Sequence, residues 1–97
     1  MRLCYVYILA SGKNGTLYVG VTSSLAERVW QHKEKVDPNC FTAKYGVDQL
    51  VYFEYSTDVF VALNREKRLK RYMRQWKVEL IQEANPEWRD LYEDIIG

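Results

Sequence analysis

The sequence contains few cysteines, one histidine and no long apolar run. Cys4 and Cys40 are far apart and form no C-x-x-C pair, and His32 is the one histidine, so the ligand spacing of a structural zinc site is missing. No apolar run approaches the roughly 20 residues that a bilayer span requires. The apolar run from Leu3 alternates aromatic with aliphatic side chains, which is typical of a strand and not of a secretory signal. We therefore expect a cytoplasmic protein with two reduced thiols and no membrane segment.

Length and composition indicate one globular domain. The chain has 97 residues, of which 47% are hydrophobic and 28% are charged. This length is enough for one core and too short for two, and the composition is that of an ordered globular chain. We therefore expect a single domain over residues 1–97.

Charge is divided unevenly along the chain. The formal net charge is +1, but residues 1–78 carry 13 Lys and Arg against 7 Asp and Glu, whereas residues 79–97 carry 1 against 6. Seven basic residues, here called the basic strip, are Arg65, Lys67, Arg68, Lys70, Arg71, Arg74 and Lys77. The strip is a candidate phosphate-binding surface, with Lys70, Arg71 and Arg74 as the expected nucleic-acid contacts. The simpler interpretation is a solvated helix face beside an acidic tail.

Hydrophobic periodicity and turn residues predict the order β-β-α-β-α-α. The predicted strands cover 3–10, 16–22 and 49–56, and the predicted helices cover 25–35, 59–73 and 75–84. Ser24 and Glu27 form a capping-box pattern, Thr57 or Asp58 is expected to cap the second helix, and FTAKYG is expected to be a loop. The closing segment is expected to pack back through Trp88, Leu91, Tyr92 and Ile95. This order predicts an α+β fold with a small antiparallel sheet against helices.

Two tyrosines and a glycine are candidates for one site on the hairpin. Alternation along a strand places Tyr18 and Gly20 on one face, and Tyr7 joins them if the register sets it beside Tyr18. Gly20 would then offer an uncrowded patch of backbone to a ligand. The alternative is chance pairing, because the chain has 8 tyrosines and tyrosine is a good strand former.

Arg28 and His32 are one helical turn apart at the edge of an apolar stripe. A guanidinium suits phosphate, and a neutral imidazole can accept or relay a proton near pH 7. The alternative for His32 is a half-exposed surface residue.

Glu66 falls within an apolar helical stripe. At 100° per residue the stripe contains Val59, Ala62, Leu63, Leu69 and Met73. A buried carboxylate is costly unless it is neutralised, paired with a cation or bound to a metal. The alternative to a metal is an ion pair with Lys70, four residues later.

Together these residue types suit the cleavage of a phosphodiester. A phenol can accept or relay a proton, an arginine can stabilise charge growing on the phosphate, and Glu66 can hold one divalent cation. Mg²⁺ needs only one or two protein carboxylates when phosphate oxygens and water complete its shell.

With these residues the sequence resembles the GIY-YIG nuclease superfamily. YVY (residues 5–7) and YVG (residues 18–20) stand for its two triplets, with ten residues between them. The segments FTAKYG, LVYFE, REKRLKR and NPEWRDLY resemble the small stand-alone YhbQ-type branch. The resemblance covers nearly the whole chain and implies a GIY-YIG endonuclease-like fold, a three-stranded antiparallel sheet flanked by helices.

The resemblance also implies roles for five residues. It implies a metal-dependent DNA endonuclease with Tyr7 as proton acceptor or relay, Tyr18 as its hydrogen-bond neighbour, Arg28 and His32 at the phosphate, and Glu66 on Mg²⁺ or Mn²⁺. Some relatives are structure-selective or act in DNA repair, and in some an added module selects the target. We expect specificity either to come from a protein partner or to be low, and we expect DNA rather than RNA as the substrate.

Two departures from the family keep other functions open. Tyr5 replaces the glycine of the first triplet, and Val78, Glu79, Leu80 and Ile81 occupy the region where several nucleases carry an Asn. One alternative is therefore a nucleic-acid-binding module that retains the nuclease fold and cleaves weakly or not at all. Another is a protein-interaction domain that uses Trp76 or Trp88 and the acidic end.

Overall fold

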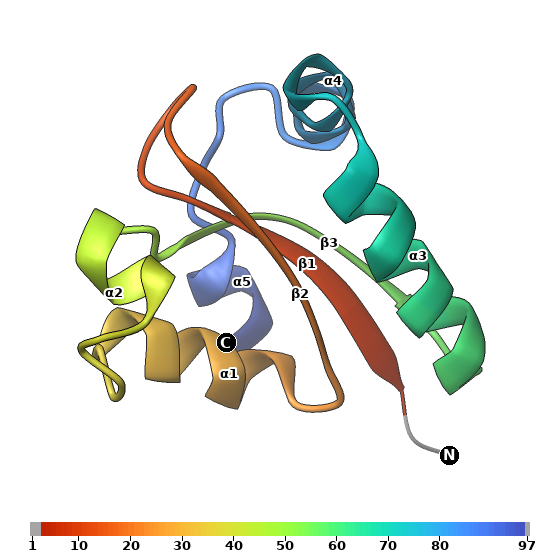
Figure 1. Ribbon diagram of the computed structural model, residues 1–97, viewed down its shortest axis with the longest axis horizontal. Coiled ribbons are helices and arrows are strands. Elements are labelled where there is room, and N and C mark those ends of the chain that lie inside the picture. Colours follow the sequence, from red (N-terminus) through yellow and green to blue (C-terminus); the bar gives the residue numbers. More distant parts are fainter. Residues whose placement is uncertain (1–2, 97) are drawn as a thin grey trace.

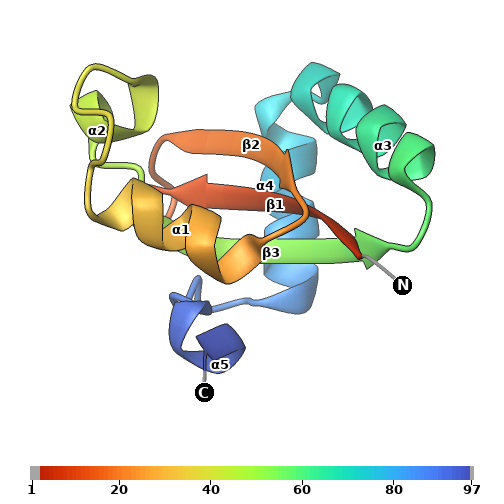
Figure 2. The ribbon, with the colours of Figure 1, turned by 90° about the horizontal axis from the view of Figure 1, so that it is seen from below.

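The computed structural model describes residues 3–96 and has one antiparallel sheet between two groups of helices. The strands β1 (Cys4–Ala10), β2 (Leu17–Thr22) and β3 (Gln49–Ser56) lie in the order β2-β1-β3. The helices are α1 (Leu25–Lys33), α2 (Phe41–Tyr45), α3 (Val59–Arg71), α4 (Arg74–Ala84) and α5 (Tyr92–Ile96). Helices α1, α2 and α5 lie on one side of the sheet and α3 and α4 on the other (Figure 1). Figure 2 shows the same arrangement after a quarter turn, and the predicted α+β fold is confirmed.

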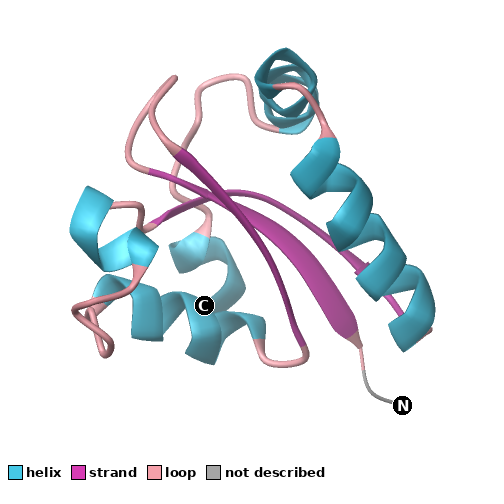
Figure 3. Cartoon of the chain, viewed as in Figure 1, coloured by secondary structure: helices cyan, strands magenta, loops and turns pink. Residues whose placement is uncertain are grey.

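Two short helices add to the predicted order (Figure 3). FTAKYG was expected to be a loop, but its first five residues form α2, which ends at Gly46 in the left-handed conformation with φ 64°. Glycine adopts this conformation without strain. The prediction was wrong because five residues are too few to show helical periodicity.

Only one of the two predicted N-caps forms. The side chain of Asp58 accepts hydrogen bonds from the backbone N–H groups of Phe60 and Val61, so it caps α3. Ser24 precedes α1 without a side-chain cap. Its own backbone N–H donates to Oγ1 of Thr22 at 3.0 Å, so this N–H is already satisfied without the expected partner Glu27. No helix within residues 3–96 is long and apolar enough to cross a membrane.

Alternating residues of β1 supply two separate cores. Val6 and Ile8 face α3 and α4, where they pack with Ala62, Leu69 and Ile81. The other face packs Tyr7 and Leu9 with residues of α1 and of the segment before β3: Leu25, Val29, Val47 and Leu50. The sheet therefore separates two packing environments, called here the α3 face and the α1 face.

The closing segment packs back onto the molecule, as predicted. Trp88 is buried in the core of the α3 face, and Leu91, Tyr92 and Ile95 pack on the core of the α1 face. The carboxylate of Asp90 pairs with the ammonium group of Lys33 on α1. It also accepts hydrogen bonds from the backbone N–H groups of Leu50 at 3.2 Å and Tyr92 at 3.1 Å. These contacts attach α5 to α1 and β3.

Candidate active site

Tyr7 lies in the middle of the sheet with its ring over Gly20. The register pairs these two residues across β1 and β2 and pairs Tyr18 with Leu9. A Cβ atom at Gly20 would lie 2.5 Å from both Cζ and the hydroxyl oxygen of Tyr7. The interpretation of Gly20 as an open patch of backbone for nucleic acid is therefore wrong, because the residue is buried beneath the phenol. The glycine makes room for Tyr7, and this explains why a side chain is missing there.

The hydroxyl group of Tyr7 meets His32 of α1. Its oxygen lies 3.2 Å from Nε2, and both side chains are buried. The expected hydrogen-bond neighbour was Tyr18, whose ring instead stands beside both partners, with centroids 6.4 Å from Tyr7 and 5.5 Å from His32. The family resemblance implied that His32 lies at the phosphate, and the structure shows its Nε2 against the hydroxyl group of Tyr7. It can therefore act through the phenol.

Thr42 completes a chain of hydrogen bonds that the sequence did not predict. Its Oγ1 lies 2.9 Å from Nδ1 of His32 and 3.2 Å from Sγ of Cys40. The residue is buried on α2, ten positions after His32. Because the segment between them is irregular, no periodic pattern links the two positions. The local signal was only that a lone buried histidine requires a partner for each ring nitrogen.

Arg28 faces the two phenols from α1. Its Nη1 group donates to Oε1 of Gln31 at 3.0 Å. Partial burial alone would lower the pKa of the guanidinium, but the facing phenols of Tyr7 and Tyr18 raise this pKa above its ordinary value. Arg28 therefore stays positively charged beside Tyr7.

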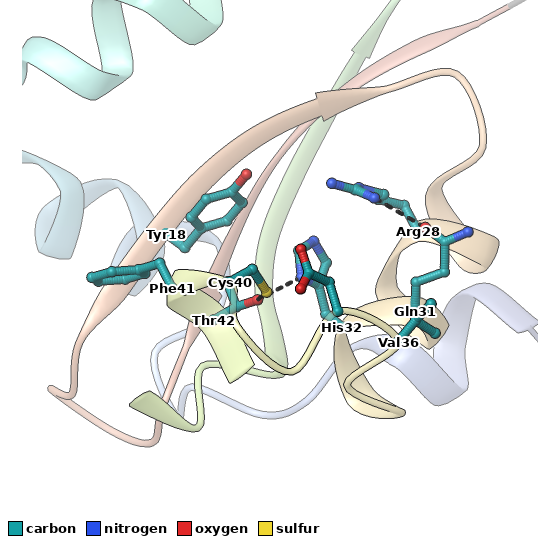
Figure 4. A pocket seen from close by; sticks show the side chains of 9 residues that line it. Tyr18, Arg28, Gln31, His32, Val36, Cys40, Phe41 and Thr42 are labelled. Atoms are coloured by element: carbon teal, nitrogen blue, oxygen red, sulfur yellow. Dashed lines mark hydrogen bonds between the residues drawn. The ribbon is translucent and has the colours of Figure 1, made fainter. Parts of the chain in front are cut away.

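A cavity of about 170 Å³ opens beside this group. Figure 4 shows Tyr18 and Arg28 on opposite sides of the opening, with Cys40, Thr42 and His32 between them. The cavity gives solvent and ligands a route to residues that lie next to Tyr7.

The environment shifts the pKa values of the two central groups in opposite directions. Burial raises the pKa of Tyr7 to about 12, with further increases from Tyr18 and Glu66 and a partial offset from Arg28. Burial and the charge of Arg28 lower the pKa of His32 below its ordinary value of 6.5. At neutral pH the site therefore contains a protonated phenol against a neutral imidazole.

Glu66 lies on the opposite side of the sheet from Arg28 and His32, and its link to Tyr7 is electrostatic. It lies on α3, its side chain is 15% exposed, and its charge contributes to the raised pKa of Tyr7. The prediction that it points inward is thus confirmed. The predicted apolar stripe is confirmed only in part, since Ala62 and Leu69 are buried while Val59, Leu63 and Met73 are exposed.

The ion pair that was the alternative explanation of Glu66 is present. Nζ of Lys70 lies 3.2 Å from Oε2 of Glu66, and the Lys70 side chain is 52% exposed. Within residues 3–96, no group of three or more Asp, Glu, His or Cys side chains comes together to hold a metal. The donors at Glu66 therefore fit only a cation that accepts one protein carboxylate and completes its shell with water and phosphate, as Mg²⁺ does.

The basic strip is divided between internal and exposed contacts. Nη2 of Arg74 donates to the backbone carbonyls of Asn14 and Gly15, each at 2.7 Å, so this predicted phosphate contact instead holds the β1–β2 turn. Nε of Arg65 donates to both carboxylate oxygens of Glu54 at 3.1 Å. Arg71 is exposed near the end of α3. A charge run does not reveal which of its members nearby carbonyls and carboxylates will bind.

Comparisons with known proteins agree on one family. The GIY-YIG catalytic domain matches residues 3–79. A UPF0213 protein of Clostridium perfringens is 36% identical over 77 residues, covering 79% of this chain and 81% of that protein. A UPF0213 protein of Autographa californica nuclear polyhedrosis virus is 32% identical over 74 residues, covering 71% and 69%. The solution NMR structure of a UPF0213 protein from Bacillus halodurans superposes with a TM-score of 0.56 at 25% identity, covering 91% of this chain and 92% of that one.

Proposed function

The chain belongs to the GIY-YIG catalytic domain family, and we propose that it is a metal-dependent endonuclease that hydrolyses phosphodiester bonds in DNA. One observation carries the proposal. The buried hydroxyl of Tyr7 is hydrogen-bonded to His32 and faces the guanidinium of Arg28, and the charge of Glu66 contributes to its raised pKa. A proton acceptor and an anion-stabilising group thus flank one hydroxyl group, and a carboxylate lies near enough to influence its pKa, which are the kinds of group that attack on a phosphate requires.

Proton transfer starts from a protonated phenol. Because the pKa of Tyr7 is about 12, its hydroxyl retains its proton at neutral pH and cannot act as a resident base. Tyr7 instead accepts a proton from the attacking water while its own proton passes to Nε2 of His32. The water oxygen bonds to phosphorus, the bond to the leaving oxygen breaks, and the leaving oxygen takes a proton from solvent. His32 is suited to its part because its lowered pKa keeps it neutral.

Arg28 and Glu66 stabilise the phosphate in different ways. Arg28 lies at the mouth of the cavity and balances the negative charge that grows on the phosphate oxygens. Glu66 would hold a single Mg²⁺ or Mn²⁺, which supplies Lewis-acid polarisation of a phosphate oxygen when it is bound. Lys70 must release one oxygen of Glu66 or share it, and its exposed ammonium group is then available to a neighbouring phosphate.

The direct test is cleavage of a set of labelled DNA substrates. We expect the purified chain to cut at least one of single-stranded, duplex, flap and branched DNA in the presence of Mg²⁺ or Mn²⁺, and chelation by EDTA to stop cleavage. Glu66→Gln should lower the rate by roughly 100-fold or more, because the carboxylate holds the cation. Glu83→Gln, on the exposed face of α4, is the matched control and should cut like the wild type. Equal cutting by Glu66→Gln and wild type would identify a contaminating nuclease.

A second candidate is a nucleic-acid-binding module without cleavage. The observation that favours it is the Glu66–Lys70 ion pair, which satisfies the carboxylate without a metal. This candidate predicts salt-dependent DNA binding that survives in Glu66→Gln and weakens when Lys67 and Arg71, one turn apart on the exposed side of α3, are both changed to Gln. Cleavage that depends on Glu66 rules it out.

A further inference from the structure

A continuous line of hydrogen bonds runs from the cavity to the buried hydroxyl of Tyr7. It links Sγ of Cys40 to Oγ1 of Thr42 at 3.2 Å, Oγ1 of Thr42 to Nδ1 of His32 at 2.9 Å, and Nε2 of His32 to the hydroxyl of Tyr7 at 3.2 Å. Each ring nitrogen of His32 thus has one partner. In a neutral imidazole one nitrogen carries the proton and the other accepts, so the two partners determine together which is which.

The chemistry of the two partners selects one arrangement. The lone pairs of a phenol are partly delocalised into its ring, which makes the phenol the stronger donor and the alcohol of Thr42 the better acceptor. The stronger pairing therefore has Tyr7 donating to Nε2 and Nδ1 donating to Thr42. The hydroxyl proton of Thr42 then points to Sγ of Cys40, where a donated hydrogen bond lowers the pKa of the thiol. His32 and Thr42 then each have one donor and one acceptor partner, while Tyr7 donates at one end of the line and Sγ of Cys40 accepts at the other.

The position of Thr42 is fixed by the backbone of α2. Its carbonyl accepts a hydrogen bond from the backbone N–H of Val47 at 2.9 Å and another from that of Gly46, the C-cap of the helix. The side chain is buried against His32. Oγ1 therefore meets Nδ1 at a set position, as required of a group that orients a base.

The geometry points to Thr42 as a positioning residue of the reaction. Its hydroxyl oxygen accepts the Nδ1–H of His32, which leaves Nε2 without a proton and directed at Tyr7. The inference rests on the proposed nuclease function. When the Tyr7 proton moves to Nε2, both nitrogens carry protons, and the Nδ1–H bond to Thr42 stabilises the imidazolium that has formed. With the other tautomer, Nε2–H would already point at Tyr7 and could not accept its proton.

The groups around His32 set the pH range in which this arrangement can be observed. They are Tyr7 from β1, Tyr18 from β2, Arg28 from α1, and Asp37 and Cys40 from the segment between α1 and α2. Burial and Arg28 both lower the pKa of His32, so the neutral ring predominates at pH 7.5. The tautomer of the neutral ring can therefore be measured near pH 7.5.

NMR of the imidazole nitrogens tests the inference without any substrate. His32 is the single histidine of the chain, so long-range ¹H–¹⁵N correlations of the ¹⁵N-labelled protein report this ring alone. We expect a protonated Nδ1 in the wild type and in Thr42→Ser, which keeps the hydroxyl. Thr42→Val has the same shape without the acceptor and should shift the population toward Nε2–H. A wild-type ring protonated at Nε2 would overturn the inference, and this reading does not depend on whether any variant folds.

Kinetics separate positioning from a loss of structure. We expect Thr42→Val to lower kcat by about 10- to 100-fold, a part of the usual contribution of general acid–base catalysis, with KM nearly unchanged and activity restored in Thr42→Ser. Thr57→Val, at an exposed position, is the matched control. Equal kcat for Thr42→Val and wild type would overturn the inference. Absence of cleavage by every protein, with Nδ1 protonated, would instead reject the nuclease proposal and leave the hydrogen-bond order intact.

Discussion

The two faces of the sheet differ in what they bury, although they share strands. Under α3 and α4, β1 places Val6 and Ile8 in an aliphatic core. Under α1, the same strand places Tyr7 among Leu9, Val29 and the hydrogen-bonded pair of His32 and Thr42. Ile8 and Tyr7 are consecutive and equally buried, but only Tyr7 has a polar group that requires a partner. The hydrogen-bonded side chains of Tyr7, His32 and Thr42 all lie on the α1 face.

This difference separates stability from chemistry. Aliphatic burial contributes roughly 25 cal/mol per Å² and is not directional, so the α3 face can stabilise the fold without specifying any single atom. A buried polar chain stabilises less, because its hydrogen bonds replace bonds to water, but it fixes proton positions. Substitutions of the buried aliphatic residues on the α3 face should therefore change mainly the free energy of unfolding, and substitutions of the hydrogen-bonded residues on the α1 face mainly the rate of cleavage.

Ile8→Ala should have the largest effect on stability. Deleting a fully buried aliphatic side chain lowers the free energy of unfolding by about 2–5 kcal/mol through lost burial and the cavity left behind. Urea denaturation followed by circular dichroism measures this loss. The folded fraction should cleave DNA at close to the wild-type rate. A tenfold lower rate in fully folded protein would break the proposed separation of the two faces.

Gly20→Ala should lower both the stability of the fold and the rate of cleavage, because Gly20 lies on the α1 face directly beneath Tyr7. The added Cβ would lie 2.5 Å from Cζ of Tyr7 and must displace the ring. We expect a loss of about 1–3 kcal/mol, as for other overpacked positions, and a severe loss of cleavage. Melting curves and single-turnover assays measure the two effects. The β2 neighbour Val21, which belongs to the α3-face core, offers the contrast: Val21→Ala should affect stability alone.

Protonation of His32 should cost stability in mild acid. Its pKa is lowered in the folded protein, so folding favours the neutral ring. The contribution is fully present above the unfolded value of about 6.5 and is lost as the pH falls from there through the lower folded value. The free energy of unfolding of the wild type should therefore fall more steeply below pH 6.5 than that of His32→Gln. Cleavage should decline over the same range, and parallel stability curves for the two proteins would contradict this assignment.

The smallest effects are expected in the basic strip. Arg71→Gln should weaken DNA binding and reduce the slope of log affinity against log salt concentration by about 1, as removal of one phosphate contact does. Arg74→Gln should mainly loosen the β1–β2 turn that its guanidinium holds, with faster amide hydrogen exchange at residues 11–16. Fluorescence anisotropy at several salt concentrations measures the binding. If Arg74→Gln reduced the salt dependence of DNA binding more than Arg71→Gln does, Arg74 and not Arg71 would be the phosphate contact.

Periodic features of the fold could be predicted from the sequence, and irregular contacts could not. Strand alternation placed Tyr18 and Gly20 on one face, and helical periodicity pointed Glu66 inward, because both depend on local geometry. The register that sets Tyr7 over Gly20 is a pairing between strands, so the alternation left it open. Thr42 lies on a five-residue helix whose position is set by tertiary contacts. Arg74 was predicted to contact phosphate because it belongs to the basic strip. The carbonyl groups that it binds instead could not be predicted, since they lie about 60 residues earlier in the chain.

Tyr7→Phe examines the proposed role of the Tyr7 hydroxyl in proton transfer, because it removes one oxygen from the α1 face and leaves the ring that covers Gly20. We predict a folded protein destabilised by about 1 kcal/mol, whose single-turnover rate of DNA cleavage falls by roughly 100-fold or more. Cleavage by Tyr7→Phe at the wild-type rate, in the same preparation in which Glu66→Gln is inactive, would contradict it.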